Sequence, residues 1–117
     1  MIKLKLNIDF INSLNVLCIS IIQIANESLS KCKGITEQAK YKSEMYEINQ
    51  VKDRLEIQRI KMRSNSWARK KIVFRLSPTQ SYILVKYWGR TLEPINNYNM
   101  VLVSELANDI HKQLTNL

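Results

Sequence analysis

A run of seventeen residues without a single charge, Phe10 to Asn26, constrains the fold of this 117-residue chain more than any other feature. Eleven of the sixteen residues from Phe10 to Ala25 are apolar. A helix this apolar has to be covered over most of its surface, so the run predicts a core helix. A helix at a membrane interface or against a partner protein is the alternative. The helical spacing is carried by Phe10, Ile11, Leu14, Leu17, Cys18, Ile21 and Ala25.

The same run reaches only the lower length limit for crossing a bilayer. Polar residues such as Asn12, Asn15 and Gln23 interrupt it, and Asp9 stands where a signal peptide would carry positive charge. We therefore expect no transmembrane segment. We expect a cytoplasmic protein, or one in the equivalent soluble compartment of an organelle.

The residues on either side of this run give the next two elements. From Ile2 to Ile8 apolar and polar residues alternate strictly, which is the period of a half-buried strand. After a break at Gly34, a longer helix is predicted to continue to about Arg63. Packing of this helix against the first one is the prediction, and a short coiled-coil seam is the alternative. Its apolar positions recur every seven residues at Tyr41, Ile48, Leu55 and Met62.

The segment from 70 to 88 allows two interpretations. Two stretches rich in β-branched and aromatic residues, 71–76 and 82–88, flank a turn at Ser77 and Pro78, and this pattern favours a β-hairpin. Ser77, Pro78 and Gln80 also form the signature of a helix start, which is the alternative. With the hairpin, the chain is predicted to be one small α+β domain, residues 1–117.

The predicted element order is β-α-α-β-β-α. A small antiparallel sheet with its hairpin near 70–88 packs against two long N-terminal helices and a C-terminal helix. The last helix follows Pro94 and is indicated by an amphipathic spacing of Val103, Leu106, Ala107, Ile110 and Leu114.

Positive charge is concentrated in one segment of the sequence. The chain has a net charge of +8, yet all ten acidic residues lie outside residues 57–92, which hold nine Lys and Arg residues. The segment therefore carries +9, and the remainder of the chain carries −1. Such a concentration is typical of a surface that binds a polyanion, because each cation that meets a phosphate releases condensed counterions. A basic face that only keeps the protein soluble is the alternative.

The hairpin interpretation makes a more specific prediction. With an even-numbered turn, Arg75 and Lys86 would share the outer face of the hairpin with Tyr82 and Trp88, so that cations and aromatic rings alternate as in surfaces that bind single-stranded nucleic acid. Trp67 lies between two arginines before the hairpin and is a candidate for base stacking. The candidate nucleic-acid-binding residues are Arg59, Lys61, Arg63, Trp67, Arg69, Lys70, Lys71, Arg75, Tyr82, Lys86, Trp88 and Arg90.

The sequence offers little for catalysis. His111 is the only histidine, and no phosphate-binding glycine motif, metalloprotease motif or nucleophile-elbow motif occurs. Cys18 and Cys32 are interpreted as core thiols, because they are too few for a zinc site or a disulfide framework. We expect no enzymatic activity, no metal and no cofactor.

These observations predict a non-enzymatic module that binds nucleic acid or ribonucleoprotein through residues 57–92. The alternative is a small structural or assembly subunit, or an interaction adaptor of a larger complex, whose positive charge matches an acidic protein partner. A peripheral membrane role is a third possibility.

Overall fold

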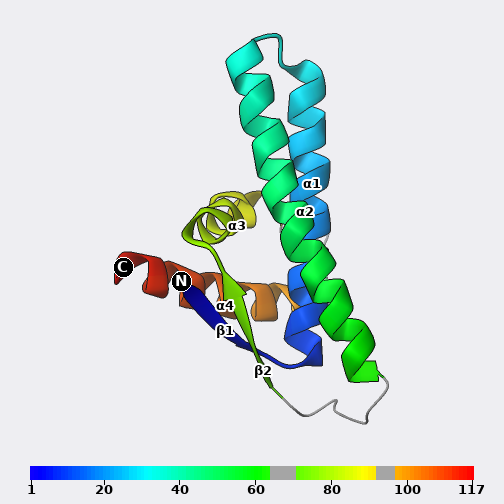
Figure 1. Ribbon diagram of the computed structural model, residues 1–117, viewed down its shortest axis with the longest axis vertical. Helices are drawn as coiled ribbons and strands as arrows, with labels where there is room; N and C mark the ends of the chain where they lie inside the picture. The colour runs from blue at the N-terminus through cyan, green and yellow to red at the C-terminus, as the bar shows by residue number, and fades with distance from the viewer. Residues whose placement is uncertain (64–70, 92–96) are drawn as a thin grey trace.

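The computed structural model describes residues 1–63, 71–91 and 97–117 (Figure 1). Its elements in chain order are β1 (Ile2–Leu6), α1 (Ile8–Lys31), α2 (Ile35–Arg63), β2 (Ile72–Leu76), α3 (Pro78–Thr91) and α4 (Asn97–Thr115). The described part of the chain is therefore mostly helical, with four helices and one small two-stranded antiparallel sheet, which makes it a small α+β fold.

The two long helices α1 and α2 form an antiparallel pair that extends away from the sheet (Figure 1). The apolar positions predicted for α2 include Ile48, Leu55 and Met62, and all three are buried in the same core cluster as Leu14 and Ile21 of α1. Packing of the second helix against the first, as predicted, is confirmed. The molecule is consequently elongated, with a longest extent of 48 Å.

Helix α1 is the central element of the core. It packs against α2, α3 and α4, and Ile11, Leu14, Cys18 and Ile21 are fully buried. Among the described helices, α1 is also the one long and apolar enough to cross a membrane by length and composition, with 39% of that window buried in the fold. Its contacts with three other helices account for the absence of charge from residues 10–26.

The sheet consists of β1 and β2, which pair in an antiparallel register. Ile2 lies opposite Leu76, Leu4 opposite Phe74, and Leu6 opposite Ile72. In β1 the alternation predicted from the sequence is present, because Ile2, Leu4 and Leu6 are buried while the residues between them are exposed. Helix α4 contacts β1 from one side (Figure 1).

The element order consists of two successive strand-helix-helix units. In the first unit Asn7 alone separates β1 from α1, and Asn7 Oδ1 accepts a hydrogen bond from the Phe10 amide at 2.9 Å. In the second unit Ser77 alone separates β2 from α3, and Ser77 Oγ accepts from the Gln80 amide at 3.1 Å. Each strand therefore leads directly into a helix through one N-capping residue.

The predicted hairpin is wrong in its second strand. Residues 82–88 belong to helix α3, so the order is β-α-α-β-α-α, and β2 pairs with β1 instead of with a following strand. The capping box prevails over β-propensity here: Ser77 N also donates to Gln80 Oε1 at 3.2 Å, completing the reciprocal pair. The apolar residues of the segment suit a helix as well, because Ile83, Leu84 and Tyr87 are buried at helical spacing.

The two thiols also differ from the prediction. Cys18 is buried as expected, and burial raises the pKa of its thiol to about 12. Cys32 follows the last residue of α1 and is only partly buried, so it is not a core thiol. Its Sγ donates to Glu37 Oε2 at 3.1 Å, and this hydrogen bond raises the pKa of the Cys32 thiol.

The capping box gives a direct test of the helical interpretation of residues 78–91. We expect Ser77→Ala to lower the free energy of unfolding by about 1 kcal/mol, because the Gln80 amide loses Ser77 Oγ as its acceptor and the reciprocal hydrogen bond from Ser77 N to Gln80 Oε1 is no longer supported. Ser77→Asp should retain the stability, because aspartate is also a good N-capping residue. Urea unfolding measures the difference, with the exposed neighbour Thr79→Ala as the control. Equal stability of the three variants and the parent protein would contradict the capping role.

Candidate nucleic-acid interface

The outward face of the sheet is uniformly basic or apolar. Lys3 and Lys5 of β1 and Val73 and Arg75 of β2 are exposed, because they alternate with the buried residues of each strand. Lys71 directly precedes β2, is exposed and continues the alternation that Val73 and Arg75 follow. We call Lys3, Lys5, Lys71 and Arg75 the basic sheet face; none of the outward positions of the two strands carries a carboxylate.

The register brings like charges together on this face. Lys3 lies directly opposite Arg75, and Lys5 lies opposite Val73. Like charges in directly opposed cross-strand positions are destabilising. Within the described residues, no ion pair engages any of the four cations of the basic sheet face. Among the described residues no carboxylate neutralises these cations, and an external polyanion could do so.

The backbone beneath this face is held in place by α4. Lys3 N donates to Gln113 Oε1 at 2.9 Å, and Gln113 Nε2 donates back to Lys3 O at 2.7 Å. Gln113 Nε2 also reaches Asp109 Oδ1 at 3.2 Å, which orients the amide. One side-chain amide thus satisfies both backbone groups of Lys3 on the outer edge of β1. The backbone of Lys3, from which its exposed side chain projects, is thereby held by the fold.

Three of the predicted residues, Arg59, Lys61 and Arg63, lie at the end of α2. Arg59 is partly buried, and its Nη1 lies 3.6 Å from Glu56 Oε2 one turn earlier. Lys61 is exposed. The end of α2 and the start of β2 lie at the same end of the molecule (Figure 1).

The predicted residues of 82–88 do not join the basic sheet face. Tyr82 is 63% exposed, but it stands on α3. Trp88 is partly buried and packs against the core. The interpretation in which Arg75, Tyr82, Lys86 and Trp88 share one hairpin face is wrong, since residues 82–88 form a helix and not a strand.

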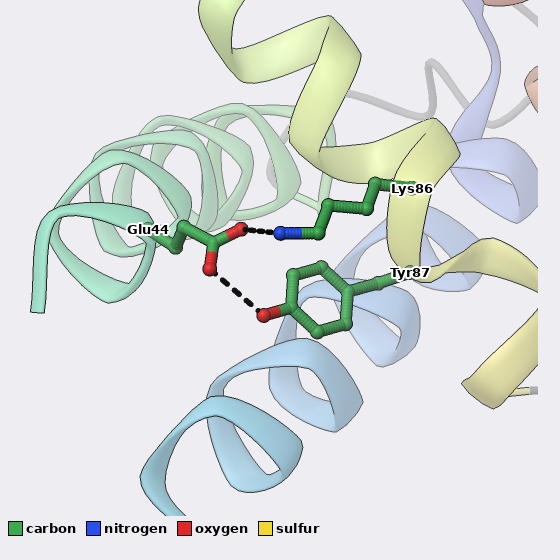
Figure 2. Close-up of polar contacts among 3 residues, drawn as sticks. All are labelled: Glu44, Lys86 and Tyr87. Atoms are coloured by element: carbon green, nitrogen blue, oxygen red, sulfur yellow. Dashed lines mark hydrogen bonds and ion pairs between the residues drawn. The ribbon is translucent and has the colours of Figure 1, made fainter. Parts of the chain in front are cut away.

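Lys86 has a structural role instead. Figure 2 shows its Nζ donating to Glu44 Oε2 at 2.9 Å, while the Tyr87 hydroxyl donates to Glu44 Oε1 at 2.9 Å. Glu44 is buried on α2, so the two hydrogen bonds join α3 to α2. Burial lowers the pKa of the Lys86 ammonium, but the hydrogen bond to Glu44 and its charge outweigh burial and leave that pKa raised.

The remaining predicted residues cannot be placed on a surface. Trp67, Arg69 and Lys70 lie outside the described residues, and for Arg63 and Arg90 only the backbone is described. Conversely, Lys3 and Lys5 were not among the residues predicted to bind nucleic acid. Their signal was the polar half of the alternation from Ile2 to Ile8, but only the pairing of β1 with β2 places them beside Arg75.

Comparisons of this chain with protein-family models, with curated proteins and with solved structures find no match. Among the described residues there is no group of three or more His, Cys, Asp or Glu side chains that could hold a metal ion. The geometry of the described residues is therefore the basis on which a function can be proposed.

The different positions of Lys86 and Arg75 predict different effects on stability. Lys86→Gln should lower the free energy of unfolding by about 1–3 kcal/mol, because it leaves the buried Glu44 carboxylate without its cation. The effect stays below that of a fully buried pair, since 27% of the Lys86 side chain is exposed. Arg75→Gln should change stability by no more than about 0.5 kcal/mol, because its side chain stands in solvent. Both variants lose one positive charge, so each is the control for the other. Chemical denaturation measures the two stabilities, and coinciding midpoints would contradict the structural role of Lys86.

Proposed function

We propose that this protein is a non-enzymatic nucleic-acid-binding module whose basic sheet face meets the phosphate backbone. The observation that carries the proposal is the face itself, in which three cations of the two strands and Lys71, just before β2, stand together with no carboxylate among the outward positions. Phosphate contacts of this kind supply most of the affinity of sequence-independent nucleic-acid binding.

The spacing of the cations supports contact with several phosphates at once. Lys3 and Lys5 are two residues apart on one strand, which separates their Cα atoms by about 7 Å, and Lys71 and Arg75 are separated by about 13 Å. The strands themselves lie about 5 Å apart. The face is thus an array of positive charge on regular secondary structure, where side chains are held more precisely than on loops.

The surrounding residues can extend this surface. Arg59 and Lys61 belong to the last turns of α2, and α2 ends at the same end of the molecule at which β2 begins (Figure 1). The exposed side chain of Val73 lies at the centre of the face and offers an apolar contact between the cations. Tyr82 and Trp88, the predicted stacking residues that the structure describes, are on α3. Base stacking on the sheet itself is therefore not part of the proposal.

The first test is the salt dependence of binding to a fluorescently labelled single-stranded RNA. If about six cations reach phosphates, the affinity of the parent protein should fall by about two to three orders of magnitude between about 50 and 200 mM salt. Lys5→Gln combined with Arg75→Gln should reduce the magnitude of the salt slope by about one to two units. Fluorescence anisotropy at several salt concentrations measures both quantities.

A matched control removes the same charge elsewhere. Lys33 and Lys42 are exposed near the far end of the α1 and α2 pair, so Lys33→Gln with Lys42→Gln should leave the salt slope at its parental value. Equal losses in the two double variants would show that net charge alone matters and would contradict the proposed face. Tighter binding to polyglutamate than to RNA would contradict the nucleic-acid proposal and favour an acidic protein partner.

A further inference from the structure

The strands β1 and β2, which together we call the ribbon, share one sequence pattern. Residues 2–7, IKLKLN, and residues 72–77, IVFRLS, align seventy positions apart, and the last residue of each segment caps the helix that follows. The register places Leu4 opposite Phe74, which is also its counterpart in this alignment. An approximate two-fold axis perpendicular to the sheet, passing between Leu4 and Phe74, therefore exchanges the two strands. The ribbon has the symmetry of a dimer, although one chain supplies both strands.

The outward residues of the ribbon break this symmetry. The axis exchanges Lys5 with Arg75, and both of these are cations. It exchanges Lys3 with Val73, so that a cation at one end corresponds to an isopropyl group at the other. One end of the ribbon consequently presents Lys3 beside Arg75. The other end presents Lys5 beside Val73, whose side chain is 57% exposed. A surface that matches both ends of the ribbon is therefore itself asymmetric.

The shape of the ribbon distinguishes between kinds of nucleic acid. The described sheet has two strands, and the major groove of B-form DNA, about 12 Å wide, admits a two-stranded ribbon. The outward positions of both strands are exposed, so no described helix covers the face that would enter the groove. None of these positions is aromatic, whereas proteins that hold single strands rely on stacking of the bases. Side chains cannot read the narrow major groove of duplex RNA. The ribbon therefore fits duplex DNA best.

The outward side chains are of the types that recognise base edges in this groove. An arginine donates two hydrogen bonds to guanine O6 and N7, and a lysine donates to the same atoms. An apolar side chain contacts the methyl group of thymine. Lys3 and Lys5 are about 7 Å apart along β1, which is about two base-pair steps of about 3.4 Å. The two ends of the ribbon therefore meet different base pairs.

We infer that the ribbon enters the major groove of duplex DNA and recognises a short asymmetric site, with Arg75 on a guanine and Val73 against a thymine methyl group. Lys3 and Lys5 add hydrogen bonds to guanine at the two ends. Because one chain supplies both strands, a single copy of the protein occupies the site. The inference rests on the proposed function and narrows its ligand from nucleic acid to duplex DNA.

The test begins with selection of bound duplexes from a pool of randomised DNA, followed by sequencing. The parent protein should enrich one site that is not palindromic and bind it with one protein per duplex. It should bind this duplex about tenfold or more tightly than either of its single strands. Replacing each thymine of the site in turn by uracil, which lacks the methyl group, should identify one position at which binding weakens about threefold to fivefold. This loss should be smaller for Val73→Ala, whose methyl group makes less contact.

Three further variants keep the result decisive. Val73→Lys places a cation at the counterpart of Lys3, so the sites that it selects should become palindromic and lose the thymine preference. Tyr46→Lys adds the same charge at an exposed position of α2, outside the sheet, and should select the parental site. Arg75→Gln should weaken binding of the selected duplex about tenfold or more and relax the preference for guanine. It serves alone should Val73→Lys fail to fold.

The outcomes separate this inference from the proposed function. Binding without sequence preference, or equal affinity for duplex DNA and single strands, would overturn the placement of the ribbon in the groove and leave the phosphate contacts of the proposed function intact. A palindromic site selected by the parent, or an asymmetric site unchanged by Val73→Lys, would overturn the asymmetric recognition. Failure to bind any DNA or RNA at about 50 mM salt would refute the proposed function as well.

Discussion

The antiparallel pairing of β1 with β2 is the interaction on which the rest of the structure depends. It joins the start of the chain to a strand that begins seventy positions later, so a large loop must be closed before any of its contacts form. Burial of Ile2, Leu4 and Leu6 offsets that cost, with about 1.5–3 kcal/mol for each fully buried aliphatic side chain. Because each strand leads through one capping residue into a helix, the pairing also sets where α1 and α3 begin.

The same pairing places like charges opposite each other, and no ion pair among the described residues engages them. Lys3 and Arg75 face each other across the strands, whereas Lys86, also in the basic segment, is neutralised by the buried Glu44. The difference separates charge that holds the helices together from charge that remains available to a partner. Sequence position alone does not separate the two, since both kinds of cation lie in the acid-free segment from 57 to 92.

Elements with strong periodicity could be predicted from the sequence. The alternation from Ile2 to Ile8 predicted β1, and the uncharged run predicted α1, because each pattern buries one face under any tertiary arrangement. Residues 82–88 were harder, since β-branched and aromatic side chains suit a strand and a buried helix equally well. The reciprocal hydrogen bonds of Ser77 and Gln80 decided the outcome locally, but their strength relative to β-propensity is not visible in the sequence.

The candidate interface could be predicted only in part, because pairing between distant segments brings its residues together. Lys71 and Arg75 were found from charge clustering, but Lys3 and Lys5 join them only through a pairing between distant segments. One signal was available: IKLKLN at residues 2–7 and IVFRLS at residues 72–77 share a strand pattern that ends in a capping residue. The buried Glu44 that removes Lys86 from the surface had no such signal, because it lies among exposed charges on α2.

The central claim is that the outward face of this two-stranded sheet is the surface that meets a polyanion. Mapping backbone amide chemical shifts during titration with a single-stranded oligonucleotide at low salt tests it most directly. The account predicts that the largest changes fall on Lys3, Lys5, Val73 and Arg75 and diminish as salt is added. Changes confined to the far end of the α1 and α2 pair, or no changes at all, would contradict it.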